Sequence, residues 1–204
     1  TMGVLLEAAG TDPRLALSLE AVGGTLVPAL VTESLDGETA AGTEVLTGGA
    51  APATDLTIPG VALVDAADQG ETAPDAAAGA PDSSDAPSVR LVNPGSETAT
   101  VSISMIGSDG EQSLPGADSV AVDPGAVFDV SLSGVPAGEY GVRVSSDSPV
   151  AAGVRLVRSA GVYPERSGAL LHDVAWLQAA TPAAGEAGSI ALPRGEGLTS
   201  SLVL

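Results

Sequence analysis

Apolar and polar residues alternate along the middle of the chain, between Ser88 and Arg158. In residues 98–106, Val101, Ile103 and Met105 occupy every second position, which is the period of a β-strand with one buried face. The same reasoning predicts six strands, at residues 88–92, 98–106, 120–122, 127–132, 140–145 and 150–157. Six short strands within about seventy residues are typical of an antiparallel sandwich.

Turn signals separate the predicted strands. Residues 107–110 contain Asp-Gly, which tolerates the positive φ of a tight hairpin. Residues 123–125 read Asp-Pro-Gly, which fits a type II turn with Pro second and Gly third. A loop is expected at residues 146–149. Tyr140 follows a Pro-containing turn and is either a tyrosine corner, with its hydroxyl bonded to backbone, or an ordinary half-buried tyrosine.

One face of the predicted sandwich is apolar throughout, and this face fixes the register, because a slip of one residue would turn every apolar side chain outward. The residues expected on the inner face are Val101, Ile103, Val130, Leu132, Val142, Val144 and Val154.

The sequence changes character between Asp65 and Ala86, where acidic residues sit among Ala, Gly and Pro with hardly an aliphatic side chain. Such a segment buries too little apolar surface to offset the entropy lost on ordering. Residues 64–87 are therefore predicted to form a solvated linker or loop. Calcium binding is the alternative, but the carboxylates do not follow the alternating spacing that wraps a cation.

Internal similarity suggests more than one unit. Residues 4–17 match residues 127–142 in hydrophobic pattern and turn position, and residues 198–204 repeat the strand that opens at Val89. The predicted fold is all-β, with immunoglobulin-like antiparallel β-sandwich units in tandem. A partial sandwich at 1–63 is followed by the 64–87 linker and a complete sandwich at 88–188. Residues 189–204 are expected to complete the partial unit, within one chain or between two chains by exchange, because exposed strand edges invite aggregation.

The amino-acid composition excludes several classes of function. The 204 residues include 26 acids and seven bases, all Arg, for a formal charge of −19. This charge repels nucleic acid and anionic lipid headgroups, so no nucleic-acid partner is expected. Cysteine is absent, which excludes disulfides, a thiol nucleophile and a thiolate-bound metal. The sequence holds no apolar run long enough to be a transmembrane segment.

A family resemblance rests on residues 136–144 (Pro-Ala-Gly-Glu-Tyr-Gly-Val-Arg-Val), 146–153 and 173–177. Over residues 88–180 the chain resembles a family of secreted or membrane-anchored actinobacterial proteins of unknown function. The resemblance implies an extracytoplasmic location in the cell envelope, secreted or anchored through a segment outside this sequence. It supplies no catalytic residue.

Candidate chemistry is sparse. His172 is the only imidazole and no G-x-S-x-G elbow accompanies it, so no catalytic residue is expected. Zinc would need ligands beyond one His and carboxylates, and neither a metal nor a cofactor is predicted. Trp176 and Tyr163 are candidate ligand contacts, since sugar sites use aromatic platforms; core packing is the alternative for Trp176.

The function expected from these observations is a non-catalytic structural or protein-interaction module of the cell envelope, with an envelope protein as its partner. The first alternative is a carbohydrate-binding module for cell-wall glycan that uses Trp176 and Tyr163. A hydrolase is the less favoured second alternative, because this function would require His172 to lie in a cleft beside two oriented acids.

Overall fold

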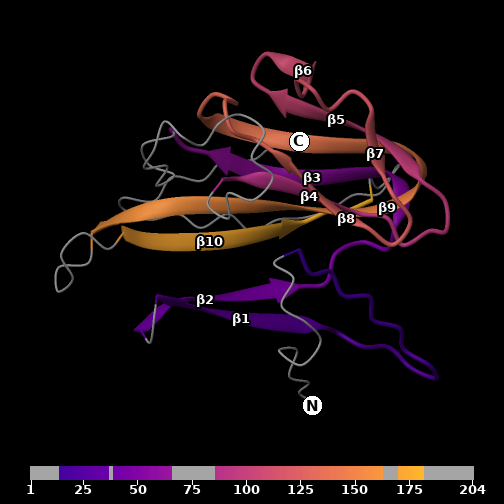
Figure 1. Ribbon diagram of the computed structural model, residues 1–204, viewed down its shortest axis with the longest axis horizontal. Helices are drawn as coiled ribbons and strands as arrows, with labels where there is room; N and C mark the ends of the chain where they lie inside the picture. Colours follow the sequence, from indigo (N-terminus) through magenta and orange to yellow (C-terminus); the bar gives the residue numbers. More distant parts are fainter. Residues whose placement is uncertain (1–13, 37–38, 66–85, 163–169, 182–204) are drawn as a thin grey trace, which may run out of the picture.

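The computed structural model describes residues 14–36, 39–65, 86–162 and 170–181 (Figure 1). Within these ranges the chain forms ten strands and no helix, and every strand pairing is antiparallel, which confirms the all-β prediction. The strands are β1 (Ala29–Asp36), β2 (Thr39–Thr47), β3 (Ala53–Leu63), β4 (Ser88–Val92), β5 (Ala99–Gly107), β6 (Gly110–Ser113), β7 (Val120–Val122), β8 (Val127–Ser131), β9 (Gly138–Val162) and β10 (Leu170–Gln178).

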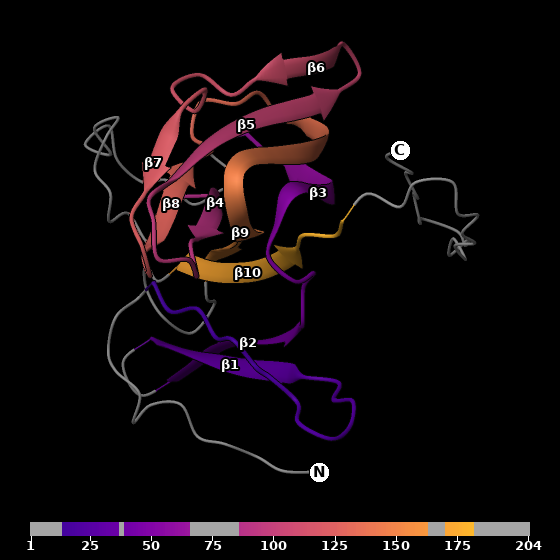
Figure 2. The ribbon, with the colours of Figure 1, turned by 90° about the vertical axis from the view of Figure 1, so that its right-hand side faces the viewer.

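Strand β9 organises the fold because it belongs to two sheets. It is 25 residues long and bends sharply along its length (Figure 2). Its first half pairs with β3 and β5, and β5 in turn pairs with β6 and β7. Its second half pairs with β4 and β10, and β4 pairs with β8. The two sheets curl around one core as a half-barrel.

The bend of β9 lies where the sequence predicted a loop, at residues 146–149, so that prediction is wrong. Ser146 still pairs with Val101, and Val150 pairs with Ala53 after a register shift in β3. The side chain of Asp147 accepts a hydrogen bond of 2.8 Å from the backbone N of Thr100. The polar residues therefore lie within a continuous strand, where the pairing partner of β9 changes from β5 to β4.

Other local predictions are confirmed. Strands 88–92 and 120–122 have the predicted bounds, and Gly107 pairs with Gly110 across the predicted hairpin. At residues 123–125, Gly125 has a φ of 70°, and the backbone N of Ala126 donates to the carbonyl of Asp123 at 3.0 Å, as a type II turn requires.

Tyr140 forms the tyrosine corner. Its hydroxyl donates a 3.0 Å hydrogen bond to the carbonyl of Pro136, four residues upstream. The ring packs against two glycines: a Cβ on Gly107 would lie 3.0 Å from the ring, and one on Gly138 would lie 3.1 Å from it. This contact ties the start of β9 to the hairpin that follows β5.

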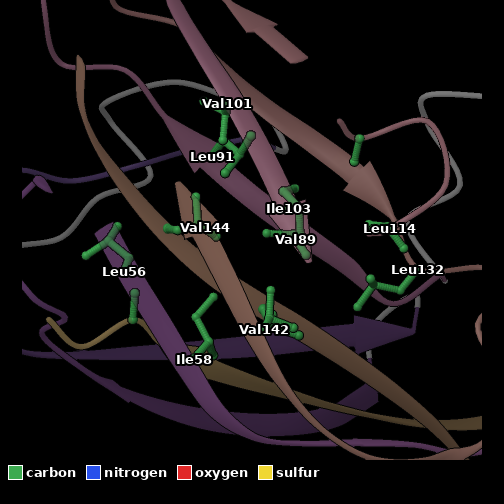
Figure 3. Packing of buried hydrophobic residues seen from close by; sticks show 14 of the residues in the cluster. Leu56, Ile58, Val89, Leu91, Val101, Ile103, Leu114, Leu132, Val142 and Val144 are labelled. Atoms are coloured by element: carbon green, nitrogen blue, oxygen red, sulfur yellow. The ribbon is translucent and has the colours of Figure 1, made fainter. Parts of the chain in front are cut away.

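The burial of the predicted inner face is confirmed (Figure 3). Six of its members are at most 1% exposed, and Val130 is half-buried and packs against the same cluster. The six are Val101, Ile103, Leu132, Val142, Val144 and Val154. The core is filled largely by Val, Leu and Ile side chains from both sheets.

Strand β3 falls within residues 1–63, which the sequence assigned to a separate partial sandwich, yet it pairs with the first half of β9. Leu56 and Ile58 of β3 lie opposite core residues of β9 and are buried. Pro59 is accommodated at a bulge next to Gly60, whose φ is 73°. Beyond β10, Ala180 exchanges backbone hydrogen bonds of 2.9 and 2.8 Å with Thr57. These bonds close the half-barrel along the side formed by β3 and β10.

Strands β1 and β2 form a separate hairpin next to β10, with β2 between β10 and β1 (Figures 1 and 2). Opposite pairs alternate in exposure along it: Leu30 and Leu46 are half-buried, whereas Val31 and Val45 are 57% and 61% exposed. The residues predicted to complete this region, 189–204, lie outside the described residues, as does most of the predicted 64–87 linker.

Candidate functional site

An arginine on the outer face of the second sheet forms the centre of the most connected polar cluster. Arg90 lies directly opposite Asp129 in the β4–β8 register. Its Nε and Nη2 donate to the two carboxylate oxygens at 2.8 and 2.7 Å. The side chains of Arg90 and Asp129 are only 13% and 21% exposed. A bidentate, charge-assisted pair with this much burial is stronger than an ordinary surface ion pair.

The same guanidinium stacks on Trp176. Its Cζ lies 4.9 Å from the centroid of the indole ring, within the range of a cation–π contact. Arg90 is on β4 and Trp176 on β10, with β9 between them. The residue of β9 opposite Arg90 is Gly153, which carries no side chain. A Cβ at Gly153 would lie 3.2 Å from the carbonyl oxygen of Leu177.

The cluster also contacts the N-terminal part of the chain. Nη1 of Arg90 donates to the carbonyl of Leu15 at 3.3 Å, and the backbone N of Trp176 donates to Oε1 of Glu44 on β2 at 3.2 Å. Arg90 and Trp176 therefore hold both the first described segment and the β1–β2 hairpin against the second sheet.

A shallow, open hollow lies beside Trp176, between the end of β2 and the end of β10. Its described lining consists of Thr47, Gly48, Gly49, Ala50, Pro59 and residues 176–181. A Cβ on Gly49 would lie 3.1 Å from Oε1 of Gln178, so the two segments approach closely there. None of the described lining residues is an acid or base, so they supply hydroxyl, amide and aromatic surface but no proton-transfer group.

The outer face of the first sheet is polar and solvated. Arg143 lies between Asp55 and Glu111 at N–O distances of 3.6 and 3.8 Å, with all three side chains about half exposed. Ser145 donates to Asp55 and Ser104 to Glu111. Exposed pairs of this kind contribute little to stability and do not form a site by themselves.

The residues singled out from the sequence are placed as follows. Trp176 is half-buried beneath Arg90 and lines the hollow. Tyr163 lies outside the described residues, so its position relative to Trp176 stays a prediction. The backbone of His172 lies in β10 opposite Ser159. Within the described ranges, no three His, Asp or Glu side chains gather to hold a metal ion.

Arg90 and Asp129 were not identified from the sequence, although both carry a usable signal. Each is the single charged residue at the centre of a short apolar strand, so each had to point away from the core. The pairing of β4 with β8 then brings the two charges together.

Large apolar side chains gather on the first part of the described chain. Among the residues whose burial is described, eight of the nine exposed large hydrophobic side chains belong to residues 15–45, the exception being Phe128. We name these eight residues the N-terminal apolar surface: Leu15, Leu17, Leu19, Val22, Leu26, Val27, Val31 and Val45. Leu15, Leu17 and Leu19 follow the period of a strand, but no strand forms there.

Comparison with protein families identifies the chain. A family model, DUF5719, a family of unknown function, matches residues 2–204. The chain belongs to this family. This result confirms the expected membership of an uncharacterised family, whereas the actinobacterial origin stays a prediction. A search of curated proteins finds no match for this DUF5719 member.

Two solved structures are similar to parts of the DUF5719 fold. A crystal structure of Thermotoga maritima 1070 has a TM-score of 0.41 and 14% identity, covering 62% of this chain and 93% of that one. The Anabaena sensory rhodopsin transducer has a TM-score of 0.36 and 18% identity, covering 50% of this chain and 93% of that one. No described helix of the DUF5719 chain is long and apolar enough to cross a membrane.

Proposed function

We propose that this domain is a non-catalytic structural and protein-interaction module of the cell envelope that binds an extended polypeptide along its N-terminal apolar surface. The observation that carries the proposal is the concentration of exposed large apolar side chains on residues 15–45. Folded proteins rarely expose this many large apolar side chains on one short stretch of chain unless they serve an interaction site.

The β1–β2 hairpin suits the addition of a strand. Within the described ranges, β1 pairs only with β2, so no other described strand occupies its outer edge. A two-stranded hairpin is marginally stable in water, and an open edge is a template for another strand. Strand addition uses backbone hydrogen bonds for affinity and alternate side chains for specificity. Val31 and Val45 would supply the apolar side-chain contacts.

The envelope location is part of the proposal and rests on the sequence resemblance at residues 136–144, 146–153 and 173–177. The formal charge of −19 disfavours nucleic acid and anionic lipid as partners. A protein segment is the partner class that an apolar surface with open strand edges fits.

The proposal is tested by site-specific photo-cross-linking. A photoreactive amino acid placed at Val31 or Val45 of the full chain is expected to give the same discrete cross-linked protein in cells of the source organism. The control position is Ser102, which is exposed on the other sheet. The proposal is wrong if both apolar positions give only the products seen at Ser102.

Glycan binding is a second candidate, favoured by one observation: Trp176 lines the hollow together with the Gln178 amide and two threonines, Thr47 and Thr181. Aromatic rings with amide and hydroxyl groups are suited to sugars. Trp176 is the only tryptophan, so its fluorescence reports on the hollow directly. Cell-wall polysaccharide should shift the emission of the native chain and not that of Gln178→Ala. An unresponsive native emission would exclude the hollow as a glycan site.

A further inference from the structure

We propose that the segment bound by the N-terminal apolar surface is supplied by the same chain, as residues 198–204, which add a strand to the outer edge of β1. This inference rests on the proposed function, because it assumes that the surface accepts an extended polypeptide. It names the occupant as a part of the domain itself.

The composition of residues 198–204 fits such a strand. The segment reads Leu-Thr-Ser-Ser-Leu-Val-Leu, with four large apolar residues, two of the residue types favoured in strands, and no charged side chain. In the sequence it follows two glycines, Gly195 and Gly197. Its apolar side chains match the chemistry of the exposed side chains of Val31, Val45 and the leucines at 15, 17 and 19.

The geometry brings the segment within reach. The backbone N of Ala50, just beyond β2, donates to the carbonyl of Ala179 at 2.9 Å, so the described chain ends at Thr181 beside the hairpin. An extended chain advances about 3.3 Å per residue. The stretch from Thr181 to Leu198 therefore reaches about twice the length of β1. No rearrangement of the half-barrel is required.

Charge favours this occupant over a second copy. Each chain carries a formal charge of −19, so two copies repel one another as they approach. Residues 198–204 add no side-chain charge next to Glu33 and Glu44, which flank the exposed valines. A tethered segment also binds at an effective concentration of about millimolar, without the entropy cost of association.

The experiment uses the absence of cysteine from the chain. Val31→Cys is combined in the full chain with Leu198→Cys, Leu202→Cys or Leu204→Cys, so that three positions allow for uncertainty in register. Each pair is treated with a short bifunctional maleimide, and the products are read by non-reducing gel and intact mass. Trp176 emission and thermal unfolding establish that each double variant is folded before it is scored.

The expected result is a cross-linked monomer in at least one pair, with a yield that does not depend on protein concentration. The matched control replaces Val31→Cys by Ser102→Cys, on the exposed face of β5, with the same C-terminal cysteines. Yields no greater than this control in all three pairs would overturn the inference. A covalent dimer whose yield rises with concentration would also overturn it and identify a second copy as the occupant.

The two proposals fail separately. If the cysteine pairs do not link but photo-cross-linking at Val31 captures an envelope protein, only the intramolecular occupant is wrong. If the pairs link and no foreign product forms, residues 198–204 occupy the surface and the protein-partner function is wrong.

Discussion

The guanidinium of Arg90 lies 4.9 Å from the ring centroid of Trp176, although their strands are separated by β9. Gly153 of β9 lies directly opposite Arg90 and carries no side chain between the two strands. The same guanidinium donates two short hydrogen bonds to the carboxylate of Asp129. Three of the four strands of the second sheet, β8, β4 and β10, therefore meet in one cluster of side chains.

Replacing Arg90 with Ala should destabilise the fold by about 1–3 kcal/mol, because Asp129 loses both charge-assisted hydrogen bonds while staying mostly buried. Urea unfolding measures the loss, and Trp176 emission should move to longer wavelength as its covered face becomes solvated. Arg143→Ala is the matched control: that side chain is 48% exposed, and its removal should change stability by less than about 0.5 kcal/mol. Equal effects of the two variants would contradict a structural role for the Arg90 cluster.

Asn93→Asp should be strongly destabilising. Asn93 is fully buried, and its Nδ2 donates to the carbonyls of Glu97 and Val122 at 2.7 and 2.8 Å. A carboxylate would replace this donor with an acceptor facing two acceptors, at a cost of about 2–4 kcal/mol. Thermal unfolding at neutral pH measures it.

Gln112→Glu makes the same amide-to-carboxylate change at an exposed position of β6 and should be nearly neutral. A small effect at Asn93 would mean that the turns before β5 and after β7 do not depend on this side chain.

Asp147 should make stability depend on pH. The hydrogen bond from the backbone N of Thr100 lowers the pKa of the Asp147 carboxyl below its ordinary value. The folded-state pKa is thus below the unfolded one, so the contribution is present above the unfolded pKa and is lost as the pH falls through the folded pKa.

The measurement is the urea midpoint of the native chain and of Asp147→Asn between about pH 6 and pH 2. The native chain should be the more stable at pH 6, and the difference should shrink as the carboxyl becomes protonated. Asp118→Asn makes the same change of charge at an exposed position away from the bend. A constant difference between native chain and Asp147→Asn across this range would show that the Thr100 bond does not favour the ionised form.

Salt should raise the melting temperature. With 26 acids against seven bases, the folded chain repels itself at low ionic strength. At about 0.5 M sodium chloride the screening length falls to about 4 Å, which weakens this repulsion more than it weakens the short Arg90–Asp129 pair. Differential scanning calorimetry in dilute buffer and in salt provides the comparison. A lower melting temperature in salt would show that favourable ion pairs outweigh the repulsion.

Local sequence alone was sufficient for much of the central unit. The alternation through Val101 and Ile103 predicted both a strand and its buried face, because side chains point to opposite faces at every second residue. The Asp-Pro-Gly turn at 123–125 was predictable because Pro and Gly each restrict or permit particular backbone angles. These outcomes depend on a few adjacent residues, whatever surrounds them.

Tertiary pairing decided the rest. Residues 146–149 were predicted to form a loop, but they lie within strand β9, where the Asp147 side chain accepts a hydrogen bond from Thr100. Strand β3 pairs with a part of β9 that is about eighty residues further along the chain. The hydrophobic pattern of β3 itself does not identify β9 as its partner. The Arg90–Trp176 contact depends on how β4 and β10 pair with β9, with Arg90 opposite Gly153 and Trp176 opposite Arg155. Such relationships cannot be predicted from local sequence, because they are selected by the free energy of non-local strand pairing. The conformational preferences of neighbouring residues do not determine them.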